Sequence, residues 1–348
     1  MRGMGTVLGA IALLAGFAIA QAQDLPRIDF KVAGSSDSLT SWAGIEKPFW
    51  SALPRASGGA FTAVARPITE LGLEGPEVMR LLKQGQLDFA HVLPGYVAEN
   101  AWIEAAGVAG VARDRDMARK ITTVWAPRLD ALMDKTYNAK ILNWYALPTQ
   151  MIFCRAPIKS LADLKGRKVH VQSVSQGDLI GGLGATAVSM PFAEVASALQ
   201  RGTVDCGIAG TLPAHRAGWH QVVTHMIEMP VDFPIVFTAV GMTTWRGLNG
   251  KSRDLLSAQM KAFEDKAWSI MADEAAMGLV CMSGLGGTCS AGKPGKVIRI
   301  QPSSADLKLR GKVVTDTVLE RWAKRCGSEC VRAWNDTAGR MAGVTAAP

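Results

Sequence analysis

Two residues with side chains that could bind an organic anion, Arg155 and His170, stand near the ends of predicted strands. A guanidinium forms two parallel hydrogen bonds with a carboxylate and stays charged at any working pH. Arg155 is therefore a candidate anchor for a ligand carboxylate. The alternative is a structural ion pair with a nearby acid such as Asp205.

His170 lies in the segment KVHV, on the opposite strand face from Val169 and Val171. As a ligand contact it would donate a hydrogen bond to a carboxylate, carbonyl or hydroxyl group. A bound anion would then raise the pKa of His170, so that affinity would weaken as the pH rises through neutrality. The alternative is a neutral histidine that fills space inside its lobe, and the sequence leaves both open.

Ser173 and Ser175 follow the His170 strand and are expected at the start of the next helix. Backbone N–H groups at a helix N-terminus favour anions, so both serines are candidate ligand contacts. Trp42 is a candidate for the mouth of the same site. The chain has 10 Trp and 3 Tyr, and one or two tryptophans at the site would suit an aromatic or bulky acid, while most belong in the core.

Sequence patterns of other kinds of site are weak. The segment GTCSAGKP has the spacing of a phosphate-binding loop, but Pro294 replaces the required Ser or Thr. The histidines at 215, 220 and 225 are spaced by five, which separates neighbours by about 140° on a helix, so we expect no metal site. No G-x-S-x-G or H-E-x-x-H motif occurs, and no basic cluster of the nucleic-acid-binding kind. We expect no enzyme, no cofactor and no nucleic-acid partner.

The elements that must position these residues alternate between strands and helices. Strands are predicted at 27–34, 61–66 and 87–93, with helices between them, and this βαβαβ order is typical of a parallel sheet covered by helices. The same alternation restarts after Arg155, with strands at 168–171 and 204–210.

Two long extended segments, at 140–155 and 233–245, are predicted to cross between these two units. Apolar residues then recur at helical spacing over 251–282, which predicts a helix roughly 45 Å long that spans both units. The predicted fold class is α/β, with two lobes, a hinge, an interlobe cleft and a long spine helix. Lobe I would comprise residues 23–150 and about 236–275, and lobe II residues 151–235 and about 285–345.

The N-terminus predicts export. An apolar run at 7–19 is followed by Ala20-Gln21-Ala22, which is typical of a signal peptide covering residues 1–22 and cleaved after Ala22. We expect a periplasmic mature chain without membrane insertion. Loss of Arg2 changes the formal charge from +8 to +7, which suits an anionic ligand or simply serves solubility.

Six cysteines in an exported chain favour disulfides over metal binding or catalysis. Fifteen connectivities are formally open. Two pairs are local in sequence and the third follows by elimination: Cys281–Cys289, Cys326–Cys330 and Cys154–Cys206.

Three segments resemble the DctP family, the periplasmic solute-binding proteins of TRAP transporters. They are RAPIKSLADLKGRKVHV (155–171), LGATAVSMPFAEVASALQRGTVDCG (183–207) and LLKQGQLDFA (81–90). The resemblance implies a two-lobed protein that closes on a small organic anion and delivers it to a sodium-driven TRAP membrane permease. An exported α/β enzyme of the hydrolase kind, and a binding protein that partners a sensor, are the alternative functions.

The same resemblance implies roles for four residues. The family's usual carboxylate-binding arginine stands where this chain has His170, and Arg155 matches its companion. Phe192 matches a phenylalanine that lines the ligand, and Ala209 replaces an asparagine. These departures argue against the small C4-dicarboxylate that is common in the family.

Overall fold

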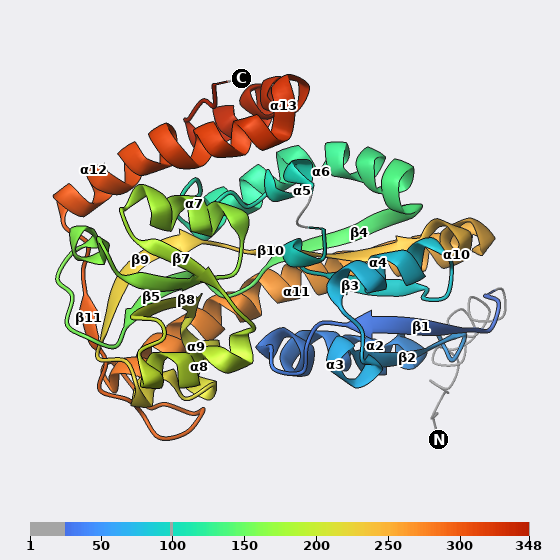
Figure 1. The fold of residues 1–348 in the computed structure, drawn as a ribbon. Helices are drawn as coiled ribbons and strands as arrows, with labels where there is room; N and C mark the ends of the chain where they lie inside the picture. Colours follow the sequence, from blue (N-terminus) through green and yellow to red (C-terminus); the bar gives the residue numbers. More distant parts are fainter. Residues whose placement is uncertain (1–24, 98–99, 348) are drawn as a thin grey trace, which may run out of the picture.

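Two mixed β-sheets, one in each lobe, form the framework of the protein (Figure 1). The computed structural model describes residues 25–97 and 100–347. The predicted signal peptide, residues 1–22, lies outside these described residues. Within them, no helix combines the length and the apolar character needed to cross a membrane.

The sheet of the first lobe has the strand order β2-β1-β3-β10-β4. Strand β1 pairs in parallel with β2 and β3, whereas β10 is antiparallel to β3 and β4. The strands are β1 (Ile28–Gly34), β2 (Phe61–Pro67), β3 (Phe89–Val92), β4 (Ala139–Ala146) and β10 (Ile235–Gly241). The helical segments of this lobe are η1 (Trp42–Glu46), α2 (Lys47–Ala56), α3 (Ile68–Leu71), α4 (Gly75–Lys83), η2 (Pro94–Val97), α5 (Ala101–Glu104), α6 (Arg115–Tyr137) and α10 (Met242–Gly247).

The sheet of the second lobe has the order β11-β9-β5-β8-β6-β7. Strand β5 is antiparallel to β8 and β9, and β6 is parallel to β7 and β8. The strands are β5 (Gln150–Cys154), β6 (Lys168–Val171), β7 (Thr186–Ser189), β8 (Cys206–Gly210), β9 (His225–Asp232) and β11 (Ile298–Ile300). The helical segments are η3 (Leu161–Leu164), α7 (Val174–Gly182), α8 (Phe192–Arg201), α9 (Thr211–Arg216) and η4 (Trp219–Gln221).

The chain crosses between the sheets twice, through β4 to β5 and through β9 to β10. Only residues 147–149 separate the first pair of strands, and only 233–234 separate the second. All four strands are largely buried, which explains why both crossings appear in the sequence as long apolar stretches. The first predicted crossing is confirmed, and so is the second as far as Gly241, whereas residues 242–245 of the predicted extended segment belong to helix α10.

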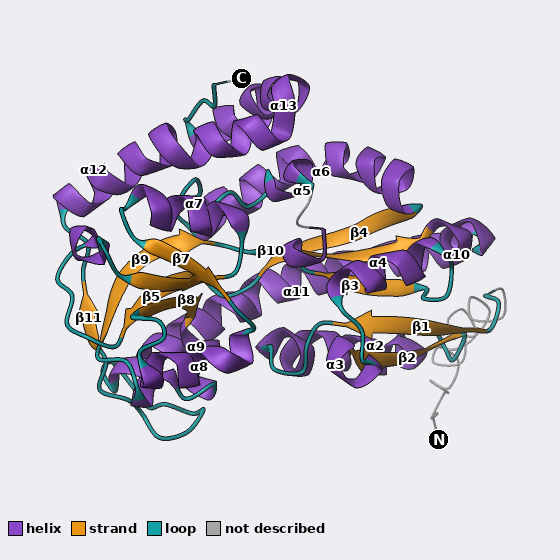
Figure 2. Ribbon diagram, in the orientation of Figure 1, coloured by secondary structure: helices purple, strands orange, loops and turns teal. Residues whose placement is uncertain are grey.

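Helix α11 (Gly250–Ser283) is the predicted spine and runs behind both sheets (Figure 2). Asn249 caps its first turn by accepting a hydrogen bond from the Ser252 backbone N–H, and Gly284 ends it in the left-handed conformation. Its 34 residues correspond to about 50 Å. The five apolar positions that predicted the helix are all buried: Leu256, Met260, Phe263, Ala267 and Met271.

Helix α11 is hydrogen-bonded to both lobes. In the first lobe, the indole N–H of Trp268 donates to the Trp144 backbone carbonyl at 2.9 Å. In the second lobe, the Thr211 hydroxyl donates to the Ala275 carbonyl at 2.8 Å. A Cβ on Gly278 would lie 2.2 Å from the Leu212 backbone nitrogen, so only glycine allows α9 to pack this closely on the spine.

The C-terminal helices lie across both lobes, where Figure 1 shows them in red above α6 and α7. Segment η6 contacts α6 of the first lobe, and η5 contacts α7 of the second. Their arrangement was not predicted in detail. Their bounds are α12 (Ser304–Val313), η5 (Val314–Leu319), α13 (Glu320–Trp334), η6 (Asn335–Gly339) and α14 (Arg340–Ala342).

All three predicted disulfides are present. Cys154 and Cys206 face each other in the β5–β8 ladder, which brings together two residues 52 positions apart. Cys281 and Cys289 close a loop at the end of α11. The third bridge spans a break in α13 at Gly327, which adopts a positive φ of 81°.

Removing the Cys154–Cys206 bridge should destabilise the protein more than removing Cys281–Cys289, because it closes the longer loop. The chain-entropy model gives losses of roughly 4 and 2.5 kcal/mol for separations of 52 and 8 residues. Urea unfolding of the two Cys→Ala double variants measures both free energies. Equal losses would contradict the expected dependence on loop length.

Candidate ligand-binding site

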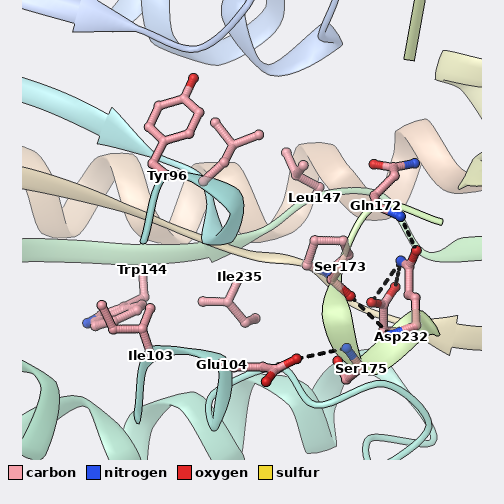
Figure 3. A pocket seen from close by; sticks show the side chains of 14 residues that line it. Tyr96, Ile103, Glu104, Trp144, Leu147, Gln172, Ser173, Ser175, Asp232 and Ile235 are labelled. Carbon is pink, nitrogen blue, oxygen red and sulfur yellow. Dashed lines mark hydrogen bonds between the residues drawn. The ribbon is translucent and has the colours of Figure 1, made fainter. Parts of the chain in front are cut away.

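A cavity of about 160 Å³ lies at the junction of the two lobes (Figure 3). Both sheets contribute to its wall through the segments that follow or precede their strands. Ligands of open α/β sheets collect at the carboxyl ends of strands, and this cavity occupies such a position. Its wall consists of Leu93, Tyr96, Ile103, Glu104, Gly107, Trp144, Leu147, Gln172, Ser173, Ser175, Gln176, Asp232, Pro234 and Ile235.

The two lobes contribute differently to this wall. The first lobe and the crossings provide mainly apolar and aromatic side chains, such as Trp144 and Ile235. The second lobe provides most of the polar groups, from the ends of β6 and β9 and from the first turn of α7. The wall therefore offers an apolar side and a polar side to a small ligand.

Asp232 is the most buried carboxyl group in this wall, with 4% of its surface exposed. The amide nitrogen of Gln176 lies 3.1 Å and 3.0 Å from its two carboxylate oxygens and donates to them. Burial raises the pKa of Asp232 to about 7; the Gln176 hydrogen bond opposes this rise and the charge of Glu104 adds to it. A carboxyl group that is partly protonated at neutral pH thus faces the cavity.

The carboxylate of Glu104, a residue of α5, lies beside the N-terminus of α7. Its Oε1 accepts a hydrogen bond from the Ser175 backbone N–H at 2.8 Å, and its Oε2 accepts one from Arg325 at 3.1 Å. Arg325 also donates to Asp178 at 2.8 Å. The helix N-terminus that we expected to attract a ligand anion is thus already bound to a carboxylate of the protein itself.

The serines predicted as ligand contacts both line the cavity. The Ser173 hydroxyl caps α7 by accepting from the Gln176 backbone N–H at 3.2 Å. Its hydrogen can still be donated to a ligand. The Ser175 hydroxyl accepts from the Ala109 backbone N–H at 3.2 Å and is buried.

Gln172 continues the polar wall beyond β6. Its amide donates to the Ile208 carbonyl at 2.7 Å and to the Gln150 side chain at 3.3 Å. Gln150 stands opposite Asp232 in the β5–β9 ladder, so three polar side chains from neighbouring strands meet at this edge of the sheet. Among the described residues that line the cavity there is no Arg, Lys or His.

Arg155 lies at the opposite end of β5 from Gln150 and is exposed. Its backbone N–H donates to the Asp205 carbonyl at 3.0 Å, and its side chain lies against Gly202, where a Cβ would be 2.0 Å from Nη1. The side chain is not part of the cavity wall. This placement does not support the carboxylate-binding role of Arg155, which stays a prediction.

His170, Phe192 and Ala209 gather around Trp219 in the second lobe. The ring centroids of His170 and Phe192 lie 6.3 Å and 5.6 Å from that of Trp219, and Ala209 belongs to the same apolar cluster. His170 is buried beside the Met190 carbonyl, 3.2 Å from Nε2, and burial lowers its pKa. Burial thus favours the neutral form of His170, which agrees with the second of the two alternatives above, and its role as a ligand contact stays a prediction.

Trp42 is buried in the first lobe and does not line the cavity. Its ring packs on Gly34, where a Cβ would lie 2.2 Å from Cζ3. Of the predicted ligand contacts, Ser173 and Ser175 line the cavity; four further polar residues line it that were not predicted: Glu104, Gln172, Gln176 and Asp232. The available signal for Asp232 was an acid at the end of a largely buried strand.

The spacing argument for the histidines assumed one continuous helix, which does not hold for His215 and His220. The rings of His215 and His220 stack at 4.2 Å, because α9 ends at Arg216 and His220 belongs to the separate turn η4. His215 also approaches Cys281 and Cys289, whose sulfur atoms are joined in a disulfide. Thiolate ligands for a metal are therefore not available in this cluster.

A second, more open cavity of about 520 Å³ lies between η1, α9 and α11. It also touches both lobes, and its buried polar residues are Thr40 and, on the spine, Glu274. It lacks the ring of strand ends that surrounds the first cavity, so we take the first as the candidate ligand site.

Ionisation of Asp232 should make stability depend on pH. The folded-state pKa of about 7 exceeds the ordinary value of 3.8, so this group contributes stability that is full below about pH 4 and is lost as the pH rises through about 7. Asp232→Asn removes this dependence and keeps an oxygen that accepts from Gln176. The melting temperature of the variant should gain on that of the wild type between about pH 5 and pH 8.

The exposed acid Asp254, changed to Asn, is the control, because its removal subtracts the same charge outside the cavity. A difference between Asp232→Asn and the wild type that stayed constant with pH would show that Asp232 does not titrate as the structure indicates.

The fold and sequence of this chain match known proteins. A family model described as bacterial extracellular solute-binding protein, family 7 (DctP), matches residues 34–280. A Bordetella pertussis extracytoplasmic solute receptor that binds pyroglutamic acid is 19% identical, with a TM-score of 0.75, and the match covers 90% of this chain and 99% of that one.

Two other solved structures are similar at comparable levels. A Desulfovibrio salexigens TRAP periplasmic solute-binding protein with bound orotic acid is 14% identical, with a TM-score of 0.76 and coverage of 90% of this chain and 99% of that one. A Pseudomonas putida F1 protein of the same kind, with bound D-glucuronate, is 20% identical, with a TM-score of 0.71 and coverage of 88% and 96%. At these identities the structures show a shared two-lobed fold.

The family model spans most of the chain, from the end of β1 to the last turns of α11. The family consists of receptors that bind a solute and are not enzymes. This chain therefore belongs to the DctP family, family 7 of the bacterial extracellular solute-binding proteins.

Proposed function

We propose that this protein is the periplasmic component of a TRAP transporter, which captures a small organic acid between its lobes and delivers it to the membrane permease. The observation that carries this proposal is the cavity at the lobe junction, whose wall is built from both lobes. A ligand in this position contacts both lobes at once, so its binding favours the closed arrangement. The closed arrangement presents a surface that a permease can distinguish from the open one.

The ligands of the structural relatives support a small acid. Pyroglutamic acid, orotic acid, succinate and D-glucuronate are bound by four of these proteins. A cavity of about 160 Å³ suits molecules of this size. Its apolar side, with Trp144 and Ile235, favours a ligand with a ring or a carbon skeleton over a highly charged one.

We further propose the division of the chain that the sequence suggested. Lobe I would comprise residues 23–150 and about 236–275, and lobe II residues 151–235 and about 285–345, after removal of a leader at 1–22. The two bonds that fix α11 to different lobes, at Trp268 and Ala275, support a boundary near residue 275.

Binding of the proposed ligand class should raise the melting temperature of the ligand-stripped protein. A ligand at about 100 times its dissociation constant adds roughly 2.7 kcal/mol, which corresponds to several degrees. We would test pyroglutamate, orotate, succinate and D-glucuronate, with a neutral sugar and a cationic amine as controls. A shift produced only by the neutral or cationic solutes would refute the assignment of an acid ligand.

A pair of matched serine variants separates ligand contact from helix capping. Ser173 caps α7 and lines the cavity, whereas Ser303 caps α12 on the outer helices. Each Ser→Ala change should cost about 1 kcal/mol of stability through the lost cap. Only Ser173→Ala should also weaken binding, by roughly tenfold, because it removes a hydroxyl that can donate to the ligand.

Titration calorimetry with the most stabilising acid measures both affinities. Equal affinities for the two serine variants would exclude Ser173 from the ligand contacts. In the same experiment, Arg155→Ala examines the predicted anchor outside the cavity. A loss larger than that of Ser173→Ala would move the carboxylate-binding site to the far end of β5.

A further inference from the structure

The carboxyl group of Asp232 faces the ligand cavity without a positively charged partner in the cavity wall. It is 4% exposed, and both of its oxygens accept from the single amide group of Gln176. A neutral amide is a weak counterpart for a buried charge, because desolvation of a carboxylate is compensated only by an opposite charge or by several hydrogen bonds. The site thus brings a poorly compensated acid to the place where an organic anion is proposed to bind.

No charged group on the surrounding described elements compensates the negative charge of Asp232. Glu104, from α5, is a second acid in the wall and lies close enough to raise the pKa of Asp232. Arg325, from α13, binds Glu104 and Asp178, and Arg321 binds Asp178 at 3.3 Å. The two guanidinium groups are therefore engaged with other carboxylates. From α7, the group that meets Asp232 is the neutral amide of Gln176.

An anionic ligand in this cavity would place a second carboxylate near Asp232. Closure of the lobes excludes water, and like charges in a water-poor site repel strongly. One proton between the two carboxyl groups converts the repulsion into a short, charge-assisted O–H···O hydrogen bond. The same logic keeps one proton on paired carboxyl groups elsewhere in proteins.

We propose that the ligand is captured together with one proton, so that neutral Asp232 donates a hydrogen bond to the carboxylate of the bound acid. This inference rests on the proposed function, since it requires an acid as the ligand. The proton comes from solvent, or is already on Asp232 at low pH, and the O–H bond stays with Asp232 while the ligand oxygen accepts. When the proton comes from solvent, capture of a monoanion adds no net charge to the site.

The half-protonated state of the free protein fixes the pH range of this effect. The pKa of Asp232 is about 7 before the ligand binds, and the ligand's charge raises it further. At about pH 8 most Asp232 side chains are ionised, so binding must take up nearly one proton, and at about pH 5.5 the uptake approaches zero. Affinity should fall by up to about tenfold per pH unit above neutrality.

Titration calorimetry counts this proton directly. We would titrate the most stabilising of the four acids (pyroglutamate, orotate, succinate and D-glucuronate) in two buffers of different ionisation enthalpy at each pH: phosphate and Tris at about pH 8, and acetate and MES at about pH 5.5. The difference between the two apparent binding enthalpies gives the number of protons taken up. We expect about one proton per ligand at about pH 8 and almost none at about pH 5.5.

Asp232→Asn should abolish the uptake and flatten the dependence of affinity on pH. The amide of this variant still donates to the ligand, as protonated Asp232 does, and still accepts from Gln176. Asp254→Asn, which removes one exposed carboxyl from α11, should leave the uptake unchanged. If Asp232→Asn does not fold, the proton count of the wild type remains the test.

The possible outcomes separate this inference from the function on which it rests. An acid that binds at about pH 8 without proton uptake, or with proton release, overturns the inference and leaves the proposed function in place. Proton uptake that survives Asp232→Asn assigns the proton to another group and also overturns it. The absence of binding by every acid at both pH values refutes the proposed function, and the inference with it.

Discussion

The narrow connection between the two sheets is the constraint on which the rest of this structure depends. Strands β4 and β10 must complete the ladder of the first sheet, and β5 and β9 that of the second, because a buried strand cannot leave its backbone groups unpaired. Two or three residues remain at each crossing. The lobes therefore face each other through their strand ends, and the cavity forms where those ends meet.

This geometry also explains the chemistry of the cavity wall. Backbone N–H and C=O groups at strand ends and in the first turn of α7 have no partner within their own strand or helix. Polar side chains of the protein form hydrogen bonds with these groups: Gln150, Gln172, Ser173 and Glu104. Gln150 and Gln172 bond each other, and Ser173 and Glu104 bind backbone N–H groups of α7, so these parts of the wall are held in place without a ligand. Asp232 is the exception, since one amide is its main support and its pKa is correspondingly displaced. A ligand that forms a hydrogen bond with such an incompletely bonded group, in a wall that is otherwise already ordered, gains the most binding free energy.

The positions of several strands and of the long helix were predictable from the sequence, because the spacing of apolar residues in a local segment indicates a strand or a helix. Alternating apolar residues located β1, β3 and β6, and helical spacing located α11 to within one residue at each end. Edge strand β7 was missed because its residues Thr186–Ser189 are mostly exposed and carry no apolar alternation. The site was less predictable, because a residue such as Asp232 acquires its properties from burial between elements distant in sequence.

The differences between the predicted ligand contacts and the residues of the cavity wall have a common physical origin. His170 was correctly placed on the opposite strand face from its valine neighbours, but that face packs on Trp219 within the second lobe. Arg155 was placed at a strand end, but β5 runs antiparallel to β8, and its end lies far from the strand ends that border the cavity. Strand direction is decided by the tertiary pairing, and the local sequence around Arg155 does not contain that information.

The spine helix restricts how the lobes can move. The Met271 carbonyl of α11 accepts from Arg115 on α6 of the first lobe, at 3.2 Å, and the Ala275 carbonyl accepts from Thr211 of the second lobe. About one helical turn separates these two attachments. While both bonds persist, the lobes cannot rotate freely about the connecting loops. A closing motion would have to bend the turn of α11 between the two bonds. If the lobes close as proposed, the backbone hydrogen bonds of this single turn would resist the bend and would favour the original lobe arrangement once the ligand leaves.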